Sequence, residues 1–193
     1  ILDLKKIFAE MESYFHGTSS GMDPLNCFIG KPLLVKDNGD IDMVKVPHSK
    51  NKGDGAIFLI NAGFPGRTDI YVNLFLNKSR DPEYRKMIIN ELIPLNNSGI
   101  EQITQGDLIA FFESLKELSS IQYNHFREMI PEQFHALWKA GMETDDYYLK
   151  LCGSGGGGFL LGFTKEFSLA KQIMKNRGLE IIPVFKNSHF RKL

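Results

Sequence analysis

Cysteine, excess charge and long apolar runs are what this sequence has least of. It holds two cysteines among 193 residues, Cys27 and Cys152, too few for a disulfide framework, which predicts a reducing, cytoplasmic setting. Lysine plus arginine (23) balances aspartate plus glutamate (23), so no charge excess favours nucleic acid or an anionic membrane. The longest apolar stretches, 56–62 and 159–163, fall well short of the roughly 20 residues that span a bilayer. We therefore expect neither nucleic acid nor a membrane as a partner.

Hydrophobic residues, in contrast, are plentiful and regularly spaced. They make up 42% of the chain, which is enough to bury a core. Leu4, Ile7, Phe8, Met11 and Phe15 recur at three- and four-residue spacing and predict an amphipathic helix over 1–15. The chain opens inside this helical pattern, from which we expect the C-terminal part of a longer protein.

Strand and helix patterns then follow one another in blocks. Asn38-Gly39 between two short extended runs, 31–35 and 41–46, predicts a β-hairpin. Strands are predicted over 56–62, 147–151, 159–163 and 179–185, and helices over 68–77, 82–95, 107–126, 131–142 and 167–176. Such blocks favour an α+β fold, an antiparallel sheet with helices packed on one face.

A run of small residues from His16 to Pro24 interrupts the first helix. Glu12 lies four residues before His16, and Asp23 follows near the end of the run. This spacing is able to bring a metal ligand and a catalytic base to one spot. Taken singly, a turn aspartate and a solvated helix acid are the commoner roles for these residues. Pro24 also disfavours a helical conformation at Asp23.

A second unusual run, 153–158, contains five glycines and one serine. Alone, it is either a flexible linker or a loop whose amides face an oxygen-rich ligand. Because both flanks are predicted core strands, we expect a close backbone approach here. We expect the neighbouring Cys152 to be a small buried side chain.

Together these motifs resemble the C-terminal half of the GHMP small-molecule kinases. Glu-x-x-x-His-Gly-Thr-x-Ser-Gly-x-Asp, from Glu12 to Asp23, is most similar to the mevalonate kinases, with Ser19 in place of their usual proline. Lys-Leu-x-Gly-x-Gly-Gly-Gly-Gly, over 150–158, is similar to the third motif of the superfamily. The resemblance implies ATP-dependent phosphorylation of a small alcohol, mevalonate first. It also implies Mg²⁺ as cofactor and ATP as second substrate.

The resemblance assigns a role to each matching residue. Asp23 takes the proton from the substrate hydroxyl or orients it, and Glu12 holds Mg²⁺ against the ATP phosphates. Phosphoryl transfer depends on such positioning and charge neutralisation. Residues expected to bind the substrate are His16, Gly17, Thr18, Ser20 and Thr68. Those expected to line the site beside the phosphates are Gly153, Ser154, Gly155, Gly156 and Gly157.

The resemblance also implies a domain assignment. Residues 1–193 would be the C-terminal kinase domain, with 1–30 the helix and catalytic turn from the end of the N-terminal lobe. The lysine motif and the Pro-x-x-x-Gly-Leu-Gly-Ser-Ser-Ala phosphate loop of the superfamily do not occur in 1–193. We therefore expect this chain to need the N-terminal part of the same protein for activity, and a homodimer is left open. The alternatives are another GHMP kinase, acting on a sugar, homoserine or phosphomevalonate, and a non-catalytic relative that binds a metabolite or partner.

Overall fold

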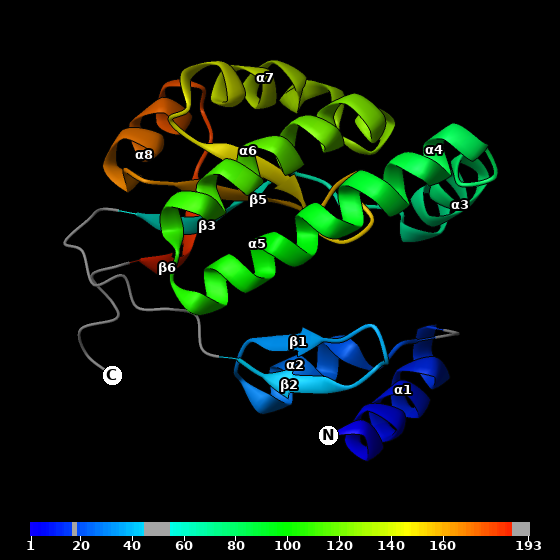
Figure 1. The fold of residues 1–193 in the computed structure, drawn as a ribbon. Helices are drawn as coiled ribbons and strands as arrows, with labels where there is room; N and C mark the ends of the chain where they lie inside the picture. The colour runs from blue at the N-terminus through cyan, green and yellow to red at the C-terminus, as the bar shows by residue number, and fades with distance from the viewer. Residues whose placement is uncertain (17–18, 45–54, 187–193) are drawn as a thin grey trace. The chain divides into compact units, whose positions relative to one another are not determined.

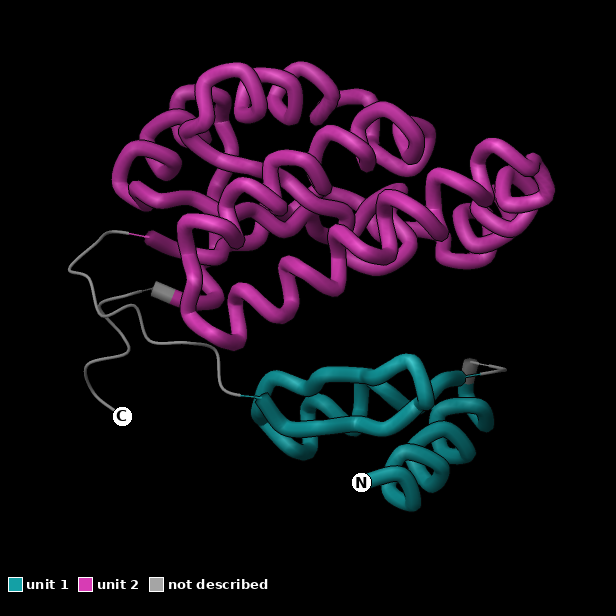
Figure 2. Tube along the Cα trace, in the orientation of Figure 1, with its two compact units in different colours: residues 1–47 teal, residues 48–193 magenta. Residues whose placement is uncertain are grey.

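The computed structural model describes residues 1–16, 19–44 and 55–186. The chain divides into two compact units, Ile1–Pro47 and His48–Leu193 (Figure 2), and each is described by itself. Unit 1 contains helices α1 (Leu2–His16) and α2 (Met22–Ile29) and the antiparallel hairpin of β1 (Leu33–Val35) and β2 (Ile41–Met43). The predicted first helix and hairpin are thereby confirmed, while the end of the second extended run, 45–46, lies outside the described residues.

Helix α2 was not predicted, because the proline was expected to exclude helix at Asp23. That expectation is wrong: Asp23 and Pro24 both lie in the first turn of α2. The first amides of a helix have no intrahelical acceptor, so a residue without an N–H costs little there. Leu25 is fully buried, and the rings of Phe8 and Phe28 pack α1 against α2 with centroids 5.6 Å apart.

Unit 2 is built on a four-stranded sheet. Its strands are β3 (Ala56–Asn61), β4 (Tyr148–Leu151), β5 (Phe159–Thr164) and β6 (Ile181–Lys186), in the order β4-β5-β3-β6 (Figure 1). All neighbouring strands are antiparallel. With helices between β3 and β4 and one between β5 and β6, this is a split β-α-β arrangement. The predicted strands are confirmed to within two residues at each end.

The helices of unit 2 are α3 (Thr68–Lys78), α4 (Pro82–Met87), α5 (Ile93–Gln105), α6 (Leu108–His125), α7 (His135–Thr144) and α8 (Phe167–Asn176). The helix predicted to end at 95 continues to Gln105, through a π-helical segment at Ile88–Leu92. Pro94 falls in the first turn of α5, directly after that segment, so it does not end the helix. The left-handed Gly106, with φ +84°, ends it instead. No helix in the described part of the chain is both long and apolar enough to cross a membrane.

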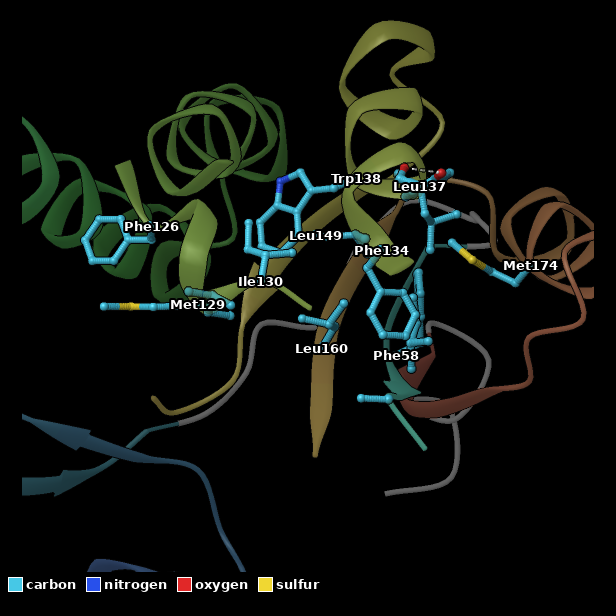
Figure 3. Packing of buried hydrophobic residues seen from close by; sticks show 14 of the residues in the cluster. Phe58, Phe126, Met129, Ile130, Phe134, Leu137, Trp138, Leu149, Leu160 and Met174 are labelled. Carbon is cyan, nitrogen blue, oxygen red and sulfur yellow. Dashed lines mark hydrogen bonds between the residues drawn. The ribbon is translucent and has the colours of Figure 1, made fainter. Parts of the chain in front are cut away.

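The main core lies between one face of the sheet and the helices α7 and α8. Phe58, Trp138, Leu137 and Met174 are almost completely buried there (Figure 3). One buried polar atom of this core is the Tyr147 hydroxyl, which donates to the Leu137 carbonyl at 2.7 Å. Burial also raises the pKa of Tyr147 to about 12. The predicted antiparallel sheet with packed helices is confirmed.

The second face of the sheet also carries helices, whereas the sequence pattern predicted helices on one face. Tyr148 and Phe163 project from this face and pack with Phe111, Leu115 and Leu118 of α6. The side chain of Gln122, further along α6, accepts a hydrogen bond from the Leu151 amide at 2.9 Å. Helix α6 therefore covers the outer edge of β4, and α5 packs beside α6.

Candidate functional site

The turn between α1 and α2 is held by one serine. The Ser19 hydroxyl donates to Oε2 of Glu12, and its oxygen accepts a hydrogen bond from the Gly21 amide at 3.1 Å. The Ser19 amide in turn donates to Ser13 Oγ at 3.1 Å. Ser19 thus ties the end of α1 to the start of α2. Glu12, which is half-buried, is fixed at the base of the turn.

Gly21 determines how closely α2 approaches α1. Its φ of +69° is in the left-handed region that favours glycine. A Cβ added there would fall against the Lys5 carbonyl oxygen and 2.6 Å from the Ala9 amide nitrogen. Because both obstacles are backbone atoms of α1, no rotamer change relieves them. The start of α2 therefore lies directly on α1 only if position 21 is glycine.

Asp23 is exposed in the first turn of α2. Unpaired backbone amides at a helix N-terminus favour a carboxylate there. The oxygen of Ser20, also exposed, accepts from the Met22 amide at 3.3 Å, which leaves its hydroxyl hydrogen to donate elsewhere. The side chain of His16, and Gly17 and Thr18 altogether, lie outside the described residues.

In unit 2 the glycine run is tightly packed, as expected from its flanking strands. Gly155 has φ +77°, and a Cβ there would be 2.6 Å from the Met129 carbonyl oxygen. At Gly157 a Cβ would be 2.7 Å from the Gly66 amide nitrogen. At Gly156 it would overlap the ring of Tyr71. This loop is not a flexible linker, because side chains at these three positions would collide with the rest of unit 2.

Some amides of the run are used inside the protein. The Gly156 amide donates to the Met129 carbonyl at 2.6 Å, and the Gly158 amide donates to the Phe64 carbonyl at 2.7 Å. Of the predicted loop residues, those whose amides bond to no described acceptor are Gly153, Ser154, Gly155 and Gly157. Gly155 and Gly157 are buried, whereas Gly153 is exposed and Ser154 half-buried, so the amides of Gly153 and Ser154 are the ones most accessible to a ligand oxygen.

The structure places Thr68 close to this loop. Thr68 begins α3, is exposed, and follows two residues after Gly66, whose backbone contacts Gly157. Beside it, Arg67 Nη2 lies 3.0 Å from Asp69 Oδ2, and this hydrogen bond lowers the pKa of Asp69.

Sequence reasoning missed Gly66 and Tyr71 as partners of the loop. Gly66 carries a signal, because it closes the Gly-Phe-Pro-Gly segment after β3. Tyr71 carries no such signal in the sequence, since an aromatic residue on a helix ordinarily packs in the core.

Two further observations concern the candidate ligands. No group of three or more His, Cys, Asp or Glu side chains that could hold a metal ion occurs among the described residues. Cys152 is exposed, so the expectation that it is buried is wrong. It comes one residue after the end of β4, where the chain has left the sheet and its core.

The candidate residues thus fall into two groups. Glu12, Ser20 and Asp23 belong to unit 1, and Thr68 and the glycine run 153–158 belong to unit 2. Each group is internally well ordered by hydrogen bonds and close backbone contacts.

Comparisons with known proteins bear on the fold. No family model matches the sequence, and no curated protein matches it. Among solved structures, Leishmania major mevalonate kinase in complex with R-mevalonate superposes with a TM-score of 0.64 and 19% identity, over 85% of this chain and 49% of that one. Lactococcus lactis galactokinase complexed with galactose superposes with a TM-score of 0.63 and 15% identity, over 94% of this chain and 58% of that one. Streptococcus pneumoniae phosphomevalonate kinase in complex with phosphomevalonate and AMPPNP superposes with a TM-score of 0.57 and 16% identity, over 78% of this chain and 43% of that one.

At these identities the likeness shows the fold: the chain has the fold of the GHMP kinases, as the motifs predicted. It spans about half the length of the structures it matches.

Proposed function

We propose that this chain is part of a small-molecule kinase that transfers the γ-phosphate of ATP to the hydroxyl of a small alcohol, with mevalonate as the first candidate. The observation that carries the proposal is the turn tied by Ser19. It fixes Glu12 at one end and presents Asp23, exposed, at the other, in a chain with the fold of the GHMP kinases. A module that only binds a metabolite needs neither a base nor a metal ligand.

Asp23 is the residue to which we assign the substrate hydroxyl. An exposed carboxylate at the N-terminus of a helix that is itself seated on α1 is held in place by backbone and not by a flexible loop. It would accept the proton of the alcohol or orient the oxygen for in-line attack. Ser20 would donate its free hydroxyl hydrogen to an oxygen of the substrate. Thr68 would bind the substrate from the start of α3.

Glu12 is the residue to which we assign Mg²⁺. Ser19 occupies Oε2 of this half-buried carboxylate, and no described residue bonds Oε1. One carboxylate with free coordination capacity suits Mg²⁺, which is usually held by one or two carboxylates together with phosphates and water. When bound, the ion would neutralise charge on the β- and γ-phosphate oxygens of ATP. The free amides of the glycine run would bind phosphate oxygens.

The test is ADP release with ATP, Mg²⁺ and mevalonate, using the intact protein that contains residues 1–193 beside the 193-residue chain alone. We expect turnover by the intact protein and little or none by the chain, because the lysine and phosphate-loop motifs are absent from 1–193. Galactose, homoserine and phosphomevalonate form parallel arms, because galactokinase and phosphomevalonate kinase share this fold. Turnover with one of these alcohols would identify it as the substrate in place of mevalonate. No ADP release with any of them would favour a non-catalytic binder.

Asp23→Asn tests the assigned role directly. Loss of a positioned base is expected to lower kcat by about 10²-fold or more. Asp3→Asn is the matched control, because Asp3 also lies in the first turn of a helix. It should leave kcat unchanged. Equal kcat values for wild type and Asp23→Asn would exclude Asp23 as the base.

A further inference from the structure

Unit 2 contains an apolar cavity of about 310 Å³, and the glycine run contributes no residue to its lining. It lies between α5, α6 and the second face of the sheet, and we name it the α5–α6 cavity. Its walls are mainly aliphatic and aromatic, contributed by residues that include Leu95, Ile103, Phe111, Leu115, Leu161 and Phe163. Small-molecule pockets begin at roughly this size. Every residue that lines the cavity belongs to unit 2.

One cation, Lys150, lines this cavity. Alternation along β4 places Tyr148 and Lys150 on the second face of the sheet, and Lys150 lies opposite Leu161. Its Nζ donates to the Leu151 carbonyl at 3.3 Å, whereas an ammonium has three hydrogens to donate. Within the described residues, no carboxylate lies within ion-pair distance of it. Burial lowers the pKa of Lys150, and the neighbouring Cys152 opposes this shift in part.

Gly99 lines the cavity on its helical side. It lies in the interior of α5, where glycine is a poor helix former. A Cβ at this position would meet no atom within 4 Å, and no positive φ requires glycine there. Neither backbone conformation nor close packing therefore explains glycine at position 99. Its absent side chain leaves room inside the cavity wall.

We propose that the α5–α6 cavity binds an amphipathic monoanion: an unbranched aliphatic chain of medium length, lying against α5 and α6, with its terminal carboxylate on Lys150. The apolar walls match the chain, and the lone ammonium with spare donors matches a single carboxylate. A polyanionic nucleotide or phosphorylated sugar does not fit, since its further charges would be buried without partners. The other polar side chains in the wall, Asn96 and Ser114, are neutral.

Paired ligands test the proposal on the full chain by titration calorimetry. Octanoate and 1-octanol share a tail and differ in the charge that Lys150 would bind. Wild type should bind one octanoate. Lys150→Met, which keeps the length of the side chain and its apolar stem, should weaken the affinity for octanoate roughly tenfold to a hundredfold. Its affinity for 1-octanol should stay within about twofold of wild type. Lys139→Met is the control, because Lys139 is an exposed lysine paired with Glu143 on α7. It should bind both ligands as wild type does.

Gly99→Leu provides a second, independent variant, because it adds bulk to the cavity wall and leaves residue 150 unchanged. It should bind neither ligand and should melt at or above the wild-type temperature. Methyl NMR should show octanoate-induced shifts at Ile57, Ile103 and Leu161, which all line the cavity. No octanoate binding by wild type, equal loss of both ligands in Lys150→Met, or undiminished binding by folded Gly99→Leu would each overturn the proposal.

Discussion

Gly21→Ala is the change that most directly tests how the turn of unit 1 is built. The added methyl would have to occupy space already taken by the α1 backbone at Lys5 and Ala9. Residue 21 would also have to keep a φ of +69°, which an L-residue with a side chain rarely adopts. We therefore expect α2 to separate from α1, and the turn that carries Glu12 and Asp23 to lose its geometry.

The expected magnitude has two parts. A left-handed conformation costs a residue with a Cβ about 1–2 kcal/mol. Forcing a methyl into a filled space costs about 1–3 kcal/mol more. Gly30→Ala separates the two parts, because Gly30 ends α2 with φ +62° and a Cβ there would meet nothing within 4 Å. Gly30→Ala should therefore show only the first cost.

Amide hydrogen exchange is the suitable assay, since unfolding of a protein with two units need not be two-state. Protection of α1 and α2 should fall further in Gly21→Ala than in Gly30→Ala, by at least about fivefold, which corresponds to about 1 kcal/mol. ADP release by the intact protein should fall in the first variant and stay near wild type in the second. Equal protection in the two variants would refute the steric reasoning.

Three further predictions follow from the described contacts. Gly156→Ala should lower the melting temperature more than Gly158→Ala, because both positions have positive φ but only the first faces a ring, that of Tyr71; equal melting temperatures would contradict this packing. Glu12→Gln should raise the Mg²⁺ concentration that gives half-maximal ADP release, since a neutral amide is a weaker Mg²⁺ ligand than a carboxylate; an unchanged metal titration would remove Glu12 as the ligand. Burial raises the pKa of Tyr147 from 10.0 to about 12, so the folded state holds this proton more tightly than the unfolded state does. The resulting stability is complete below pH 10 and is lost as the pH rises to about 12. Urea denaturation across this range should show the decline, and Tyr147→Phe should make it shallower.

The candidate site was only partly accessible from the sequence. Glu12 and Asp23 were proposed as site residues because their residue types and spacing match a motif. The hydrogen bond from Ser19 to Glu12 was not predicted, because Ser19 counted only as a departure from the proline of the motif. Likewise the glycine run predicted a close approach, but not that Tyr71 and Met129 are what it approaches. Partners distant in the sequence leave no local pattern.

The fold, like the candidate site, was predicted from the sequence only in part. Hydrophobic periodicity and turn residues by themselves determined the first helix, the Asn38-Gly39 hairpin and the strands of the sheet, because each depends on neighbours a few residues apart. The extent of α5 beyond Pro94, the helix at Asp23 and the exposure of Cys152 depended on where each residue lies relative to the ends of its element. Only the tertiary structure decided that the second face of the sheet carries α5 and α6 and borders a cavity lined by Lys150. Packing between distant segments sets that arrangement, and the alternation within β4 is compatible with either a covered or an open face.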